Sequence, residues 1–160
     1  MNSRIIEIVA EHDQDICDVI KKVGIEFGAI GEGFGPSDQE VLNMSQHYKP
    51  ENRSRYFILF INGRIVGGGG VASFNQSETI CELKKLFLLP EARGLGFGRK
   101  ISELAINAAQ DFGYQRCYLD TLSNMERAIA LYESIGFSLL TEPLSGTLHN
   151  GCDVAMIKDL

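Results

Sequence analysis

The sequence predicts a single mixed α/β domain, and three observations lead to that prediction. The chain has 160 residues, which is enough for one well-buried core and too few for two ordinary domains. Two apolar runs flank Asn62-Gly63, a dipeptide typical of a tight β-hairpin. Two later segments carry apolar residues at helical spacing, and a glycine follows each of them. Strands and helices are therefore interleaved along one chain.

The first third of the chain is expected to form a strand, a helix, a loop and a second, short helix. "RIIEIVA" is typical of a strand, and Asp13 is expected to cap the helix that follows it. "FGAIGEGFGP" has too many glycines for a regular element and is expected to be a mobile loop, with the short helix over about 37–46. The apolar positions of the first helix recur at threes and fours: Ile16, Val19, Ile20, Val23 and Phe27.

The next segment is expected to form a three-strand meander. Its first two strands lie in "YFILFINGRIVGGGGVASF". The run Gly67–Gly70 could suggest a phosphate cradle, but it lies inside a strand pattern and no Gly-Lys-Ser/Thr follows it, which argues against a P-loop. We interpret it as a strand face without side chains, against which a neighbour packs closely. The third strand, "TICELKKLFLLP", loses its alternation at Lys84-Lys85, as a β-bulge that splays the strand would cause.

The second half of the chain is expected to contain two helices and three strands. Gly113 is expected to end the first helix, and Ser123 and Glu126 resemble a capping box that starts the second. "RCYLDTL" between them is typical of a strand, and the tail after Gly136 gives two more. The inward positions expected on the two helices are Phe97, Ile101, Leu104, Ala105, Ala108 and Phe112 on the first, and Ala128, Leu131, Tyr132 and Ile135 on the second.

Composition excludes several classes of protein. The net charge of -6 argues against a protein that chiefly binds a nucleic-acid backbone. No apolar run is long enough to cross a bilayer, and the first 15 residues do not resemble a secretory signal. We therefore expect a cytoplasmic protein with neither a nucleic-acid nor a membrane partner.

Cysteine and histidine spacing gives no metal site. The four cysteines contain no C-x-x-C pair and are expected to be reduced thiols: Cys17, Cys81, Cys117 and Cys152. His12, His47 and His149 lie far apart in the sequence and lack metal-ligand spacing.

The stretch "RGLGFG", from Arg93 to Gly98, lies between a predicted strand and a predicted helix. Unpaired backbone N–H groups and the positive end of the helix would meet there and attract a phosphate, with charge from Arg93, Arg99 and Lys100. The alternative is a glycine-rich turn whose arginines lie in solvent. A dinucleotide site is not indicated, because the turn follows a meander and no acidic ribose partner stands at the expected spacing.

The sequence resembles the GNAT superfamily of N-acetyltransferases. Residues 93–98 satisfy its motif Q/R-x-x-G-x-G/A, "CELKKLFLLPEARG" is similar to its central strand, and "ALYESIGF" is similar to its Ala-x-x-Leu-Tyr-x-x-x-Gly-Phe helix. Together these cover about residues 81–137. The resemblance implies a mixed, mostly antiparallel sheet of about six to seven strands, splayed at the central strand and flanked by about four helices.

The resemblance also implies acetyl-CoA as co-substrate. Many members of the family have an asparagine seven residues before the helix tyrosine; here that position is Met125, and Asn124 either replaces the contact or only starts the helix. The backbone of Leu86, Phe87 and Leu88 would pair with the pantetheine arm. Backbone N–H groups of the loop would hold the pyrophosphate: Arg93, Gly94, Leu95, Gly96, Phe97, Gly98 and Arg99.

Two side chains are candidates for catalysis. By the resemblance, Tyr132 donates a proton to the departing thiolate, although its apolar stripe also suits a core tyrosine. Glu82 would deprotonate the amine directly or through water; its alternative is a solvated strand residue paired with Lys84. A backbone N–H near Leu86 would stabilise the oxyanion.

The last loop carries further candidates. His149 either reaches the acceptor pocket or is a solvated loop histidine, and the second interpretation is favoured here. Cys152 and Asp153 lie beside it, and a cysteine nucleophile would imply a covalent route that the family does not usually take.

Two classes of function remain open. The first is an enzyme that transfers an acetyl group from acetyl-CoA to a primary amine of a small molecule or a peptide by direct attack in a ternary complex. The second is a non-catalytic acyl-CoA-binding sensor or regulatory module. The acidic balance suits a cationic acceptor, and the family's frequent pairing makes a homodimer a state to test.

Overall fold

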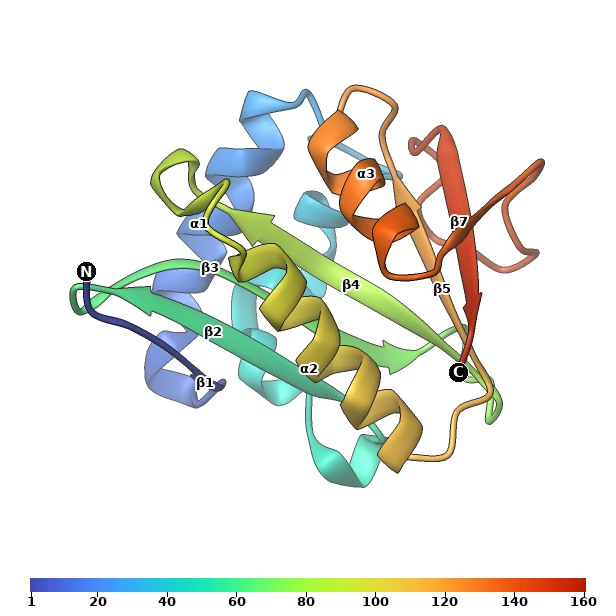
Figure 1. Cartoon of the computed structure of the whole chain (residues 1–160), viewed down its shortest axis with the longest axis horizontal. Helices are drawn as coiled ribbons and strands as arrows, with labels where there is room; N and C mark the ends of the chain where they lie inside the picture. The colour runs from blue at the N-terminus through green and yellow to red at the C-terminus, as the bar shows by residue number, and fades with distance from the viewer.

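The computed structural model describes the whole chain, residues 1–160, as one seven-stranded sheet in the order β1-β2-β3-β4-β5-β7-β6 (Figure 1). Neighbouring strands are antiparallel except β4 and β5, which are parallel. The predicted mixed, mostly antiparallel sheet is therefore confirmed. The strands are β1 (Ser3–Glu7), β2 (Arg55–Ile61), β3 (Arg64–Ser73), β4 (Ile80–Leu88), β5 (Arg116–Thr121), β6 (Ser138–Leu140) and β7 (Val154–Asp159).

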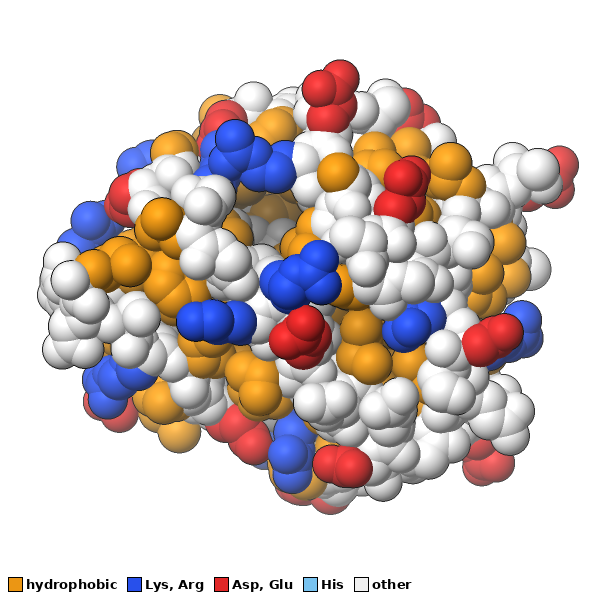
Figure 2. Space-filling model, in the orientation of Figure 1, with side chains coloured by type: hydrophobic (Ala, Val, Ile, Leu, Met, Phe, Trp, Pro, Cys, Tyr) orange, Lys and Arg blue, Asp and Glu red, His pale blue; other side chains and the backbone are white.

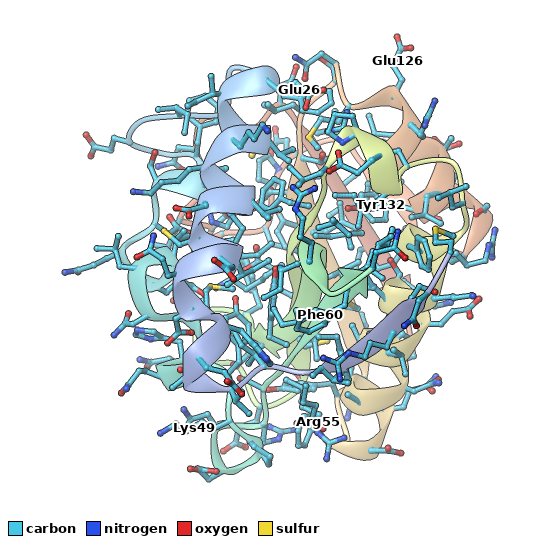
Figure 3. The ribbon with its side chains drawn as sticks, turned by 90° about the vertical axis from the view of Figure 1, so that its left-hand side faces the viewer. Glu26, Lys49, Arg55, Phe60, Glu126 and Tyr132 are labelled. Atoms are coloured by element: carbon cyan, nitrogen blue, oxygen red, sulfur yellow. The ribbon has the colours of Figure 1, made fainter.

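Helices cover both faces of the sheet. The α-helices are α1 (Asp13–Glu26), α2 (Phe97–Asp111) and α3 (Glu126–Ser134). The short helix expected over 37–46 is present as 3-10 segments, η2 (Gly35–Ser37) and η3 (Gln39–Gln46). Three further turns of 3-10 helix are η1 (Ala10–His12), η4 (Pro50–Asn52) and η5 (Pro90–Ala92). Figures 1 and 3 show α1 on one face of the sheet and α2 and α3 on the other.

The hairpin and the tetraglycine run have the structures that the sequence predicts. Asn62 and Gly63 both have positive φ, 50° and 79°, and connect β2 to β3. The run Gly67–Gly70 lies within β3. A Cβ on Gly69 would lie 2.8 Å from Ile101 Cγ2 of α2 and 2.7 Å from Leu86 Cδ1. The missing side chain therefore lets α2 approach the centre of the sheet.

The bulge in β4 splays the sheet. Lys85 has a φ of +54°, and the β3–β4 register shifts between Gly68 and Gly70 opposite it. β4 pairs with β5 only from Ile80 to Glu82. Beyond Glu82 the two strands separate, so the sheet leaves the β5-facing edge of β4 unpaired near Leu86.

Three local expectations were wrong. α3 begins at Glu126 with Met125 at its N-cap, and the Ser123 N–H and hydroxyl donate to Asp153 at 2.8 and 2.7 Å rather than capping the helix. Asp13 starts α1 but accepts hydrogen bonds from Ser45. Leu104 is 37% exposed, because it lies at the border of the buried stripe of α2.

Two further features concern the cysteines and the lengths of the helices. All four cysteines are free thiols, as expected. None of the helices has both the length and the apolar composition that crossing a membrane requires.

Candidate active site

A groove of about 680 Å³ opens where β4 and β5 separate. Figure 2 shows a hollow with a hydrophobic floor and Lys or Arg side chains at its rim, between α1 and α3. Figure 3 places Glu26 and Glu126, which lie at the C-terminal end of α1 and the N-terminal end of α3, at this same end of the molecule. The size is that of a pocket for a cofactor-sized ligand.

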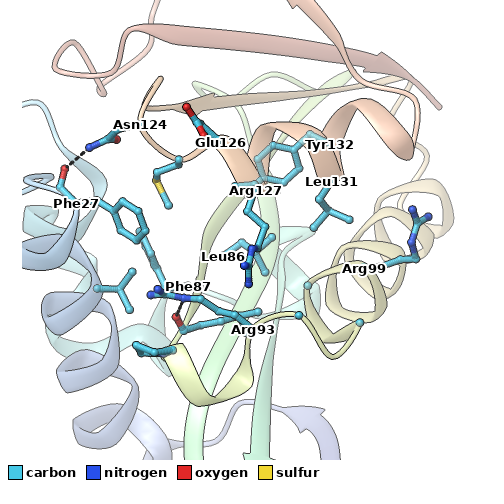
Figure 4. A pocket seen from close by; sticks show the side chains of 18 residues that line it. Phe27, Leu86, Phe87, Arg93, Arg99, Asn124, Glu126, Arg127, Leu131 and Tyr132 are labelled. Atoms are coloured by element: carbon cyan, nitrogen blue, oxygen red, sulfur yellow. Dashed lines mark hydrogen bonds between the residues drawn. The ribbon is translucent and has the colours of Figure 1, made fainter.

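The residues that line this groove come from four parts of the fold. Figure 4 shows them from α1, the end of β4, the glycine loop and α3. They are Val23, Phe27, Leu86, Phe87, Leu88, Pro90, Arg93, Gly94, Gly96, Gly98, Arg99, Asn124, Met125, Glu126, Arg127, Ala128, Leu131 and Tyr132.

The glycine loop presents backbone donors to the groove. The first N–H of α2 with an intrahelical partner is that of Lys100, which donates to the Gly96 carbonyl at 3.2 Å, so the three N–H groups before it have none. Gly94 and Gly96 have φ of 74° and 86°, values that favour glycine. A Cβ on Gly98 would lie 3.0 Å from Leu131 Cδ2 and would narrow the space between α2 and α3. The loop therefore fits the pyrophosphate of a nucleotide.

The predicted basic residues of the loop have different partners. Arg93 Nε donates to the Leu88 carbonyl at 3.0 Å, and its guanidinium makes a bidentate pair with Glu26, each contact 2.7 Å. Arg93 therefore fixes the loop against β4 and α1. Arg99 donates to the Ser134 hydroxyl at 2.7 Å, and Lys100 lies over the Phe97 ring rather than in the groove.

Arg127 is a groove residue that the sequence did not reveal. Its Nη1 lies 3.5 Å from the position that a Cβ on Gly94 would take, and it has no carboxylate partner. Figure 4 shows it extending from α3 toward the loop. Nothing in "NMERAIA" marks this arginine apart from an ordinary exposed helix residue.

Asn124 and Met125 both line the groove. The Asn124 amide donates to the Phe27 carbonyl at 3.1 Å, which links the end of α1 to the loop before α3 (Figure 4). Leu95 and Phe97 do not line it with their side chains: Leu95 is 48% exposed and Phe97 is buried in the core.

Tyr132 lies at the inner end of the groove. Its ring is buried and packs edge-on against Phe137, with the centroids 5.9 Å apart. Burial raises the pKa of the Tyr132 phenol above its ordinary value, so the hydroxyl keeps its proton at neutral pH. Tyr132 lines this groove, so its side chain is within reach of a ligand there.

A second, smaller pocket of about 60 Å³ continues from the inner end of the groove. The two cavities share Leu86, Phe87, Met125 and Tyr132. The walls of the second pocket come from the loop after α1, from β4, from the end of β5 and from the last loop. Its other lining residues are Ala29, Phe34, Gly35, Pro36, Glu82, Leu83, Lys84, Lys85, Asp120, Thr121, Leu122, His149 and Cys152.

Glu82 and His149 meet in this pocket. His149 is 9% exposed, so the favoured interpretation of a solvated loop histidine was wrong. Its Nδ1 lies 3.3 Å from Glu82 Oε2, and its Nε2 lies 2.8 Å from Asp38 Oδ2. Lys84, the partner that the alternative assigned to Glu82, instead pairs with Glu40 at 2.8 Å.

The two carboxylates beside His149 keep it charged. Burial alone would lower the pKa of His149, but the hydrogen bonds with Asp38 and Glu82 and the charge of Glu82 outweigh it and raise that pKa to about 9. Burial alone would raise the pKa of Asp38, but His149 and Lys85 lower it to about 2. At neutral pH the pair is therefore an imidazolium and a carboxylate.

The remaining polar groups of the pocket are inert or structural. Burial, with the charges of Asp120 and Asp153, raises the pKa of Cys152 to about 12, so this thiol is a poor nucleophile at neutral pH. Asp120 accepts hydrogen bonds from the hydroxyls of Tyr118 and Thr147. Asp153 is occupied by Ser123.

Three side chains of this pocket are of types that bind metal ions. Oxygen or nitrogen atoms of Glu82, Asp120 and His149 lie within 4.8 Å of one another. However, both ring nitrogens of His149 face carboxylates, so the ring offers no free lone pair to an ion. The arrangement is that of an ion-pair cluster.

Comparisons with known proteins agree with this geometry. The sequence model of the Acetyltransferase (GNAT) family matches residues 27–137. The uncharacterized N-acetyltransferase YjgM of Escherichia coli (strain K12) is 37% identical over 147 residues, which cover 91% of this chain and 87% of that protein.

Solved structures share the whole fold. An acetyltransferase from Streptococcus agalactiae has a TM-score of 0.83 at 22% identity, covering 99% of this chain and 98% of its own. The PaiA N-acetyltransferase of Thermoplasma acidophilum, solved in complex with coenzyme A, has a TM-score of 0.78 at 17% identity, covering 100% of both chains. The family match and the fold agree, and this chain belongs to the GNAT family of acetyltransferases.

Proposed function

We propose that the protein is an acetyl-CoA-dependent N-acetyltransferase that acetylates a primary amine by direct attack in a ternary complex. The observation that carries this proposal is the meeting of the two cavities at Tyr132 and Leu86, with backbone donors at the far end of one and Glu82 in the other. A thioester in the groove and an amine in the small pocket would then be in contact. A structure of similar fold, PaiA N-acetyltransferase, contains coenzyme A.

We assign each chemical task to a group of this site. Glu82 accepts a proton from the ammonium form of the acceptor, directly or through a water, which leaves a neutral amine able to attack. The free backbone N–H groups of β4 near Leu86 stabilise the negative charge that develops on the acetyl oxygen. Tyr132 protonates the departing thiolate, and the proton that the acylated nitrogen loses as the amide forms restores the Tyr132 hydroxyl.

His149 acts through Glu82 as a positioning residue. A relay in which His149 passes the proton on to Asp38 is unfavourable, because the pKa of Asp38 is about 2 and that of His149 is about 9. The imidazolium instead holds the Glu82 carboxylate in place and balances its charge. Glu82 must therefore return its proton to water through the pocket.

Replacing Tyr132 with Phe separates the enzyme from a non-catalytic acyl-CoA-binding module. The variant keeps the ring in its apolar surroundings and loses only the proton donor. We expect kcat to fall by about 10²–10⁴ fold, while the affinity for acetyl-CoA measured by calorimetry stays unchanged. Tyr114→Phe, at the other end of α2 where the hydroxyl donates to the Arg53 carbonyl, is the matched control. Unchanged transfer in Tyr132→Phe would remove this residue from the mechanism.

A further inference from the structure

The second, smaller pocket, which receives the acceptor amine in the proposed function, is called the acceptor pocket below. Every cation that lines it is already paired with a carboxylate. Lys84 Nζ lies 2.8 Å from Glu40 Oε1. Lys85, whose side chain is 1% exposed, has its Nζ 2.8 Å from Asp38 Oδ2 and 3.7 Å from Glu40 Oε1. His149 lies between Asp38 and Glu82. No cation is left to bind an anionic group of a substrate.

Carboxyl groups outnumber the cations around the pocket. Lys84, Lys85 and His149 face Asp38, Glu40, Glu82 and Asp120, three cations against four carboxyls. Burial raises the pKa of Asp120, and the charge of Glu82 adds to that rise. A carboxylate brought into this pocket would lose its hydration without gaining a partner, which is costly in a buried site.

Arg127, the nearby arginine that has no carboxylate partner, lies in the other cavity. Arg127 lines the larger groove, which receives acetyl-CoA in the proposed function and is called the donor groove below, and it lies beside Gly94. It does not line the acceptor pocket. The remaining walls of the pocket are apolar side chains, among them Phe34, Pro36 and Leu122. An acceptor therefore meets carboxylates and hydrocarbon on this side of the site.

We propose that the acceptor is an amine without a carboxylate or phosphate next to its nitrogen, such as an aliphatic or arylalkyl amine or an amine adjoining an amide, and that free amino acids are excluded. The inference rests on the proposed transferase function and names its substrate class. The paired cations Lys84, Lys85 and His149 set this selectivity. Glu40 contributes by keeping Lys84 and Lys85 occupied.

The test compares acceptors that differ in one group. Tyramine, tyrosinamide and tyrosine share a ring and a primary amine, and only tyrosine carries a carboxylate; phenethylamine and phenylalanine form a second comparison. With saturating acetyl-CoA and CoA thiol release as the readout, we expect kcat/KM for the members without a carboxylate to exceed that of the amino acid by at least about tenfold, a difference of about 1.4 kcal/mol. Equal or better use of the amino acids would overturn the inference and leave the transferase function standing.

A variant tests the cause of the selectivity. Glu40→Gln leaves Lys84 without its carboxylate, so we expect the ratio of tyramine to tyrosine to fall severalfold. The ratio within one preparation does not depend on how much of the variant is folded. Glu51→Gln, an exposed acid in η4, is the control and should keep the wild-type ratio. An unchanged ratio in Glu40→Gln would contradict the role given to the paired cations. If no acceptor reacts while calorimetry shows that acetyl-CoA binds, the transferase proposal fails, and this inference fails with it.

Discussion

The burial and the charge of His149 depend on residues that are remote in the sequence. Asp38 precedes it by 111 positions and Glu82 lies on the central strand, yet both contact its ring. The sequence around it, "LHNGCD", is that of a solvated loop, which explains the wrong expectation. Tyr132 differs, because the helix motif around it is local and indicated its position beside the cofactor groove.

The charge on His149 predicts a pH-dependent stability. Its pKa is about 9 in the folded chain and 6.5 ordinarily, so its contribution is fully present below pH 6.5 and is lost as the pH rises through about 9. In His149→Gln we expect the free energy of unfolding to drop by about 2 kcal/mol near pH 6, with the gap to wild type narrowing at alkaline pH. Urea unfolding over a pH series measures this. His47→Gln, at an exposed histidine, should keep the wild-type slope; parallel wild-type and His149→Gln curves would show that His149 is not charged.

At the scale of elements, the bulge of β4 sets the geometry of the site. The sequence revealed it, because the alternation of apolar residues breaks at Lys84-Lys85. What the pattern could not show is that Lys85 would point inward, with its side chain 1% exposed, since that depends on Asp38 and Glu40 from the segment after α1. The start of α3 was missed for a similar reason, because Asp153, thirty residues later, takes the hydrogen bonds of Ser123.

The packing of α2 on β3 predicts the effect of a single methyl group. A Cβ on Gly69 would lie 2.7 Å from Leu86 Cδ1 and 2.8 Å from Ile101 Cγ2. We expect Gly69→Ala to destabilise the fold by about 1–3 kcal/mol and to weaken acetyl-CoA binding, because the displaced helix carries the glycine loop. Thermal unfolding and calorimetry measure the two effects.

The control for that variant is Gly63→Ala. Gly63 has open space around it and a φ of +79°, so the substitution costs backbone strain of roughly 1–2 kcal/mol without moving α2. Its affinity for acetyl-CoA should equal that of wild type. Wild-type affinity in Gly69→Ala would mean that the loop does not depend on how closely α2 packs.

At the scale of the whole molecule, the sheet is two halves joined through three residue pairs of β4 and β5, and the donor groove lies where they part. The β2-β3-β4 meander and most of the buried face of α2 followed from local patterns, namely the Asn62-Gly63 turn, the bulge and the stripe of α2. The acceptor pocket did not, because its walls come from irregular segments far apart in sequence, whose conformation depends on tertiary contacts such as the Gly151 N–H to the Gly33 carbonyl, at 2.9 Å.

A ligand that bridges the two halves should stabilise the whole chain. At about 100 times its Kd, acetyl-CoA should add about 2.7 kcal/mol, a rise in Tm of about 5–10 °C for a chain of this size. Arg127→Ala removes a cation from the groove and should weaken binding by about tenfold, which roughly halves the shift at the same concentration. Arg116→Ala, exposed at the start of β5, is the control. An equal shift in Arg127→Ala would place this arginine outside the binding site.

The two cavities share only four lining residues, so the rest of the acceptor pocket can change in sequence independently of the rest of the donor groove. Substitutions in the segments after α1 and before β7 alter the acceptor pocket without touching the glycine loop or α2. Under the proposed function, exchanging these two segments together should change the acceptor preference, since His149 and Asp38 connect them. Grafting only one of the two segments from a relative would leave a buried charge without its partner. A new specificity in this fold would therefore require both segments to change together.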